Sequence, residues 1–162
     1  MESTGQIAIR TANVADVPAM AGIRATDQEA GPADSRMAAY LEGRHHPQQA
    51  LAPRVAFIAE RGHRVVGYIG GHLTERHGCH GEVQYLYVAP DSRRLGVGSE
   101  LLRRLTEWFI EHNATKLCVN ANLDSPPAVP FYLSHGAIPI NPHWYIWNDA
   151  RHLARSWEDR LT

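Results

Sequence analysis

The amino-acid sequence predicts a single α/β domain, and three observations lead to that prediction. Segments with the alternation and β-branched residues of strands are interspersed with segments of helical period along the whole chain. The 162 residues, 44% of them hydrophobic and 20% charged, suffice for one hydrophobic core of ordinary size. No repeat, low-complexity tract or linker divides the sequence, so one domain over residues 1–162 is expected.

Helix and strand signals mark the elements in the first half of the chain. Asp16 is expected to cap a helix, Gly43 to end one, and Arg61-Gly62-His63 has the composition of a hairpin turn. Residues 44–53 have the composition of a loop. The expected elements, in order, are a strand at 7–10, the helix after Asp16, a short helix at 36–43, and hairpin strands at 55–60 and 64–73.

The second half contains the clearest helix of the chain. Its apolar residues share one face at helical spacing: Leu101, Leu102, Leu105, Trp108 and Phe109. A short helix is expected to begin with Ser125 as its cap and Pro126 as its first residue, and to end at Gly136. The remaining expected elements are strands at 82–88, 116–121 and 143–147, followed by a polar end.

Charge and composition disfavour several function classes. The formal net charge of −1 gives no overall basic field, which argues against a general nucleic-acid binder. No apolar run approaches the ~18 residues that a membrane span needs, and the N-terminus lacks the pattern of a secretory signal. Cys79 and Cys118 form no disulfide framework, which fits a reducing compartment. A cytoplasmic protein without nucleic-acid or membrane partners is therefore expected.

A glycine-containing loop between a strand and the long helix predicts an anion site. Backbone N–H groups at a helix N-terminus lack intrahelical partners, and glycines let a phosphate approach them. A nucleotide P-loop is disfavoured because Ser99, and not lysine, follows the last glycine; a dinucleotide fingerprint is disfavoured because position 101 is leucine. The loop reads Arg93-Arg94-Leu95-Gly96-Val97-Gly98.

This loop resembles the (Arg/Gln)-x-x-Gly-x-(Gly/Ala) signature of the GNAT acyltransferases, the Gcn5-related N-acetyltransferases. The strand before it, ending in Val88-Ala89-Pro90, and the later segment 125–137 are also similar to the family. Ala137 stands where many members have phenylalanine, and Ser125 where many have asparagine. The resemblance implies a GNAT fold: one mixed, mostly antiparallel sheet with splayed central strands, flanked by helices.

The resemblance also implies how acetyl-CoA binds. The loop residues and Ser99 would hold the pyrophosphate, and Ser125 would supply a further contact. The pantetheine arm would lie along Leu86, Tyr87 and Val88, like an added strand. A backbone N–H near Val88 would then stabilise the oxyanion that forms on the thioester carbonyl.

Two residues match the family's acid–base positions. Glu82 would accept the proton that the acceptor amine loses, and Tyr132 would protonate the departing thiolate. Each also has a structural interpretation: a solvated carboxylate at a strand start, and a tyrosine packed beside Phe131. For Tyr132 the position relative to the glycine turn, which agrees with the family, favours the functional interpretation. Strict alternation would put Glu82 on the same strand face as Gln84, Leu86 and Val88.

The predicted function is acetyl-CoA-dependent N-acetyl transfer to a primary amine of a small molecule or peptide, by direct attack in a ternary complex. A coenzyme A-binding regulatory module and an acyltransferase for another acyl group are the alternatives. No metal is expected, because His77, Cys79 and His80, with His72 nearby, lack the paired spacing of a zinc site. Alternation in 143–147 separates Trp144 from Tyr145 and Trp147, so one set is expected to be buried; a homodimer through this segment stays open.

Overall fold

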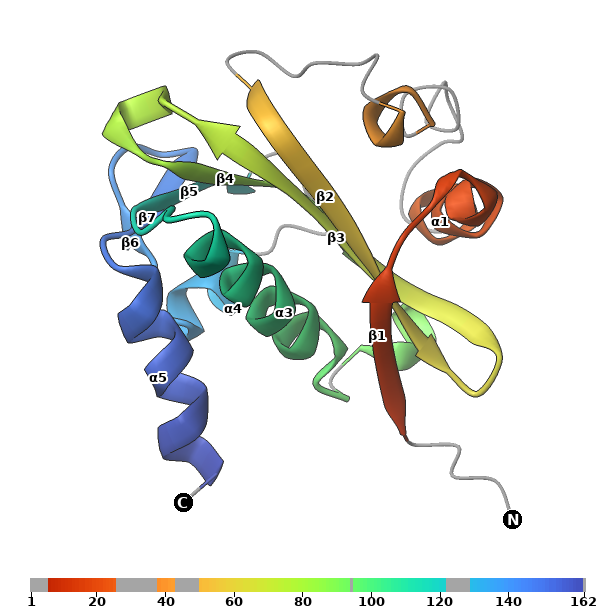
Figure 1. Cartoon of the computed structure of the whole chain (residues 1–162). Helices are drawn as coiled ribbons and strands as arrows, with labels where there is room; N and C mark the ends of the chain where they lie inside the picture. Colours follow the sequence, from red (N-terminus) through yellow and green to blue (C-terminus); the bar gives the residue numbers. More distant parts are fainter. Residues whose placement is uncertain (1–5, 26–37, 43–49, 94, 122–128, 162) are drawn as a thin grey trace.

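A computed structural model describes residues 6–25, 38–42, 50–93, 95–121 and 129–161. They form a seven-stranded sheet in the order β1-β2-β3-β4-β5-β7-β6 with helices on both faces, shown in Figure 1. The strands are β1 (Ile7–Thr11), β2 (Ala50–Arg61), β3 (Arg64–Thr74), β4 (Gly81–Val88), β5 (Leu117–Asn120), β6 (Ile138–Pro139) and β7 (Trp144–Trp147). The α-helices are α1 (Val17–Ala25), α3 (Val97–Glu111), α4 (Val129–Ser134) and α5 (Ala150–Leu161), with a further helical turn at residues 38–41.

The sheet is mixed and mostly antiparallel, as predicted. Among the strands of the described residues, only β4 and β5 run parallel, and they pair over Gly81–Val83 and Leu117–Val119. The rest of β4 continues to Val88 along β3, so within the described chain its other edge has no strand beside it beyond Val83. This divergence confirms the expected splay of the central strands.

Each face of the sheet has its own apolar core. On one face α3 and α5 pack against strand residues that include Phe57, Ile69, Val83 and Leu86. On the other face α1 and the turn at 38–41 pack against Ile58, Tyr68, Tyr85 and Tyr87. Figure 1 shows α3 and α5 on the side opposite α1. No helix in the described residues is long and apolar enough to cross a membrane.

Helix α3 is amphipathic as its sequence predicts. The five apolar residues expected on its inner face are all buried: Leu101, Leu102, Leu105, Trp108 and Phe109. On the outer face Arg103 pairs with Glu100 at 3.8 Å and with Glu107 at 3.6 Å, three and four residues away. Such exposed pairs each contribute only a few tenths of a kcal/mol, so burial of the inner face holds the helix in place.

Three expectations about the elements were wrong. β2 begins at Ala50, so residues 50–53 belong to a strand where a loop was expected. Ala50 and Leu51 pair with the end of β3, and a register shift separates them from Arg54. The C-terminal segment, expected to be a polar end, forms α5, which buries Ala150, Leu153 and Trp157 against α3. The short strand β6 was also missed.

A β-bulge in β4 overturns the expected alternation of this strand. Gly71 pairs with Val83 and Gly70 with Tyr85, so Gln84 is an extra residue opposite the β3 ladder. Val83 and Leu86 consequently both face α3, and Glu82 faces the α1 side. Glu82 therefore does not share a face with Leu86 and Val88.

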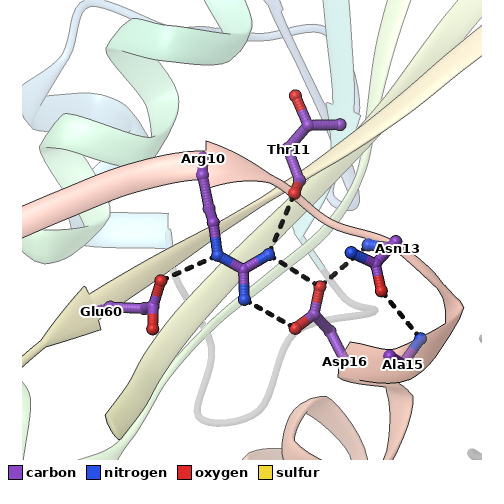
Figure 2. Close-up of polar contacts among 6 residues, drawn as sticks. All are labelled: Arg10, Thr11, Asn13, Ala15, Asp16 and Glu60. Atoms are coloured by element: carbon purple, nitrogen blue, oxygen red, sulfur yellow. Dashed lines mark hydrogen bonds and ion pairs between the residues drawn. The ribbon is translucent and has the colours of Figure 1, made fainter. Parts of the chain in front are cut away.

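The entry into α1 is held by Arg10, shown in Figure 2. Its Nη1 and Nη2 donate to the two carboxylate oxygens of Asp16 at 3.0 and 2.8 Å, and its Nε donates to Glu60 at 2.8 Å. A 3-10 turn at Val14–Asp16 leads into α1, and Asn13 is the N-cap of this turn: its Oδ1 accepts from the Ala15 amide, and the Asp16 carboxylate accepts from the Asn13 amide. Asp16 thus closes a capping box instead of being the predicted cap.

We expect Asp16→Asn to lower the Tm near neutral pH by about 3 °C, because it removes a charged, bidentate contact from a side chain that is 10% exposed. The hydrogen bond from Arg10 lowers the pKa of Asp16 below its ordinary value. Such a group stabilises the fold above the unfolded-state pKa, about 3.9 for aspartate, and this stabilisation is lost as pH falls through the folded-state pKa.

Thermal unfolding from about pH 7 down to about pH 2.5 would measure the effect. The gap between Asp16→Asn and the parent protein should close over the acid range. Asp91→Asn is the matched control, because Asp91 pairs with Arg64 at 2.9 Å but both side chains are more than half exposed. Equal losses in the two variants would contradict a special role for the Asp16 pair.

Candidate active site

The free edge of β4 presents backbone groups to the gap between β4 and β5. The Ala89 amide donates to Val66 O at 2.8 Å, which fixes the phase of the antiparallel ladder with β3. Hydrogen-bonded and non-hydrogen-bonded pairs alternate along an antiparallel ladder. The backbone N–H and C=O groups of Tyr85 and Tyr87 therefore also point toward β3, and the amides of Leu86 and Val88 point away from it. The Val88 amide therefore faces the gap, where an extended ligand could pair with the strand.

The anion loop follows directly after this edge. A 3-10 turn at Pro90–Ser92 leads through Arg93 to Gly96, and α3 begins at Val97. Gly96 has a φ of 82°, in the left-handed region that favours glycine, and a Cβ there would meet no atom within 4 Å. Arg93 Nε donates to Val88 O at 3.0 Å and ties the loop to β4. The predicted site residue Arg94 lies outside the described residues.

The N-terminal turn of α3 also contacts α4. A Cβ on Gly98 would lie 3.3 Å from the Phe131 ring, so glycine at this position permits close packing of α4. Ser99 Oγ lies 2.9 Å from Nε2 of His135, a buried residue that the sequence analysis did not single out. Val97 is buried in the core, whereas Leu95 is exposed. The predicted site at 95–99 is thus a helix N-terminus held by α4.

Tyr132 lies in the core beside this turn. Its side chain is fully buried, and its ring makes edge contacts with Trp147 and Phe131 at centroid distances of 5.8 and 5.5 Å. The expected helix end at Gly136 is confirmed by a φ of 88° there and by the bond from Ala137 N to Tyr132 O. Ser125 lies outside the described residues. The acid role of Tyr132 stays a prediction.

Glu82 is buried, so it is not a solvated carboxylate at a strand start. Only 2% of its side chain is exposed, and its Oε1 lies 3.2 Å from Arg76 Nε and 3.6 Å from His72 Nε2. Its strand neighbour across the β4–β5 pairing is Cys118. Buried charges of this kind persist only when they are paired, and Arg76 supplies the partner.

Two residues that the sequence analysis did not assign to the site complete this cluster. His72 on β3 is fully buried, and its Nδ1 lies 3.3 Å from the hydroxyl of Tyr40, which donates to Gly71 O at 2.8 Å. Burial raises the pKa of Tyr40 well above its ordinary value, so the hydroxyl stays protonated. His72 lies opposite Glu82 in the β3–β4 pairing. This position could have pointed to His72, but it is known only when the register of the two strands is known.

The polar loop between β3 and β4 packs against β7. The Arg76 guanidinium lies 4.7 Å from the ring of Trp144, and His77 makes an edge contact with the same ring at 4.8 Å. Tyr145 and Trp147 are buried on the opposite strand face, which confirms the predicted alternation. Cys79 and Cys118 are both free and buried. Within the described residues, no group of three or more potential ligands could hold a metal ion.

Residues 22–137 match the family described as "Acetyltransferase (GNAT) family", which is more than half of the chain. The chain belongs to the GNAT acetyltransferase family. The divergence of β4 and β5 and the glycine-containing loop before α3 both lie within the matched residues. Comparison with curated protein sequences gives no significant match.

Solved structures of acetyltransferases share the fold. A putative GNAT acetyltransferase from Desulfovibrio desulfuricans aligns with a TM-score of 0.71 at 15% identity, over 90% of this chain and 99% of that one. The PaiA N-acetyltransferase from Thermoplasma acidophilum, solved in complex with coenzyme A, aligns with a TM-score of 0.66 at 12% identity, over 87% and 96%. A ribosomal-protein-alanine N-acetyltransferase from Brucella melitensis gives 0.63 at 20% identity, over 84% and 95%.

Proposed function

We propose that this GNAT protein transfers the acetyl group of acetyl-CoA to a primary amine of a small molecule or peptide, in the cytoplasm, by direct attack in a ternary complex. The observation that carries the proposal is the free edge of β4 ending at a helix N-terminus. That edge can pair with an extended amide chain, and the helix terminus can bind a phosphate. A coenzyme A thioester has both parts, because its pantetheine arm contains amides and joins the thioester to a pyrophosphate.

The coenzyme would lie along β4 with its pyrophosphate at the α3 terminus. The pantetheine would pair with the backbone of Leu86 to Val88, and the amides at 96–99 would receive the pyrophosphate. Arg93 and Arg94 would add positive charge, and Ser125 a further contact. The Val88 amide, which points into the gap, would then donate to the thioester carbonyl as negative charge develops on its oxygen.

Acetyl transfer requires that the acceptor nitrogen lose protons and that the departing thiolate gain one. The acceptor ammonium gives one proton to Glu82, and its nitrogen then attacks the thioester carbon. As the C–S bond breaks, Tyr132 donates a proton to the thiolate and regains one from the new amide nitrogen, so the products are an N-acetyl amine and free coenzyme A. The burial of Glu82 near the closed end of the β4–β5 gap supports this assignment.

An acceptor screen that monitors free thiol released from acetyl-CoA tests the proposal. Polyamines, aminoglycosides, amino acids and peptides form the panels, and longer acyl-CoA donors test the acyl preference. Thiol release that depends on an amine supports the enzyme, with the acetylated product identified by mass. Tight binding of acetyl-CoA without turnover on any panel favours a coenzyme A-binding regulatory module instead.

We expect Gly96→Asp to weaken acetyl-CoA binding at least tenfold relative to Gly96→Asn. Both side chains tolerate the left-handed backbone to a similar degree, and both project into open space, so the pair differs mainly in one negative charge at the pyrophosphate position. Calorimetry at low and high salt measures the difference, which should shrink with salt. Equal affinities in the two folded variants would place the pyrophosphate elsewhere.

A further inference from the structure

The hydrogen bonds around His72 determine where its ring carries a proton. Tyr40 has one hydroxyl hydrogen, and it is donated to Gly71 O at 2.8 Å. The same hydroxyl oxygen lies 3.3 Å from His72 Nδ1, so in this second contact the ring nitrogen has to be the donor. His72 therefore holds a proton on Nδ1.

The other ring nitrogen then faces a carboxylate. A neutral imidazole carries a single N–H, so with Nδ1 protonated the Nε2 atom presents a lone pair. Nε2 lies 3.6 Å from Glu82 Oε1 and has no hydrogen-bond partner among the described residues. Two facing lone pairs repel each other in a buried site, whereas one proton on Nε2 makes the same contact an imidazolium–carboxylate pair. The geometry thus has a place for one proton between His72 and Glu82.

Arg76 makes Glu82 a poor place to keep that proton. Its Nε lies 3.2 Å from the same Oε1 atom, and a neighbouring cation favours the ionised carboxylate. A proton that moves on to His72 Nε2 leaves the carboxylate ionised and still paired with Arg76. Glu82, His72 and Arg76 together can therefore accept a proton and keep the ion pair between Glu82 and Arg76. Without His72, the proton would stay on Glu82 and weaken that ion pair.

The other polar side chains described around the cluster do not stabilise a protonated His72 ring as the Glu82 carboxylate does. Arg54 on β2 is the cross-strand neighbour of His72 and lies over the Tyr40 ring at 4.9 Å, so it opposes a positive charge there. Tyr85 on β4 meets the Tyr40 ring edge-on at 5.3 Å, and Cys118 on β5 is buried beside Glu82. Among these neighbours, Glu82 is the one that favours a protonated ring.

We propose that His72 is a positioning residue that acts through Glu82 and stores the proton lost by the acceptor ammonium. This inference rests on the proposed amine acetylation. The ammonium N–H bond breaks toward Glu82, the proton passes to His72 Nε2, and the freed nitrogen lone pair forms the C–N bond. The stored proton returns to water through Glu82 after product release, and the thiolate receives its proton through Tyr132.

The first test is the pH profile of turnover for His72→Asn. The amide nitrogen of asparagine can replace Nδ1 as donor to Tyr40, but nothing replaces Nε2. With acetyl-CoA and the best amine of the panels, kcat near pH 7 should fall about 10- to 100-fold, the deficit should shrink as pH rises, and KM for acetyl-CoA should stay within about twofold. His63→Asn, an exposed histidine in the β2–β3 turn, is the matched control and should follow the parent protein.

The second test does not depend on turnover. In protein labelled with ¹⁵N-histidine, with the His72 signals assigned from their loss in His72→Asn, Nδ1 should remain protonated throughout the titration. In Glu82→Gln the protonation of Nε2 should move to lower pH, because the carboxylate that favours it is gone. An unprotonated Nδ1 near neutral pH, or the same Nε2 titration in both proteins, would overturn the proposal even if His72→Asn failed to fold.

The proposed function and the role of His72 are overturned by different results. A protein that acetylates no amine overturns the proposed function and the proton store together. A protein that acetylates amines while His72→Asn runs parallel to the parent at every pH overturns the role of His72 alone.

Discussion

Replacing Tyr132 by phenylalanine should lower kcat by about 10² to 10⁴ while the affinity for acetyl-CoA stays within about twofold. The ring keeps its edge contacts with Trp147 and Phe131, so the packing of α4 against β7 survives. What is lost is the hydroxyl that protonates the thiolate, an interaction made only as the C–S bond breaks. Steady-state kinetics with the best acceptor, together with calorimetry for acetyl-CoA, measures both quantities.

The control has to separate a lost acid from a lost buried hydroxyl. Tyr68→Phe is matched, because Tyr68 is also almost fully buried but packs against Tyr87 on the α1 face of the sheet. The Tm of each variant is expected to lie within a few degrees of the Tm of the parent protein. Full activity of Tyr132→Phe would assign this tyrosine to packing alone, and another group would have to protonate the thiolate.

The sequence predicted those parts of the fold that depend on local pattern. Helix α3 was recognised because its apolar residues repeat at helical spacing, and the β2–β3 hairpin because two β-rich segments flank Arg61-Gly62-His63. Gly62 has a positive φ at this turn, as its place there requires. Helix α5 carries the same kind of signal in Ala150, Leu153 and Trp157, but its mean polarity hid it. Its stability comes from packing on α3, which a segment read by itself does not reveal.

The anion loop was predictable for the same reason, since its glycines and the helix start are adjacent in sequence. The acid–base cluster was not, because its members come from different elements: a turn before β2, the strand β3, the loop after it, and β4. Their meeting depends on the β3–β4 register and on the bulge at Gln84. A one-residue bulge reverses the facing of every residue before it relative to those after it, and no local pattern in the strand marked its position.

Glu82→Gln should reduce turnover most at neutral pH, by at most about 10⁴, and the deficit should shrink toward about pH 10. Glutamine keeps the size of the side chain but cannot accept a proton beside His72 and Arg76. Below the ordinary amine pKa, about 10, most of the acceptor is ammonium and needs a base. At higher pH the free amine is abundant, so the variant should approach the parent protein in a series of rate measurements from about pH 6 to about pH 10.

Two further variants separate proton transfer from structural support. Glu75→Gln also removes one carboxylate, but from an exposed position at the start of the loop between β3 and β4. It should therefore leave the pH profile unchanged. Glu82→Asp keeps a carboxylate and should recover part of the neutral-pH rate, although its shorter side chain moves the oxygens away from His72 and Arg76. If Glu82→Gln runs parallel to the parent protein at every pH, then Glu82 only orients the acceptor or supports β4, and the proton passes directly to water. If Glu82→Asp recovers part of the rate and Glu82→Gln does not, then Glu82 accepts the proton. The aspartate variant shares with the parent protein the ability to take a proton, and the glutamine variant lacks it.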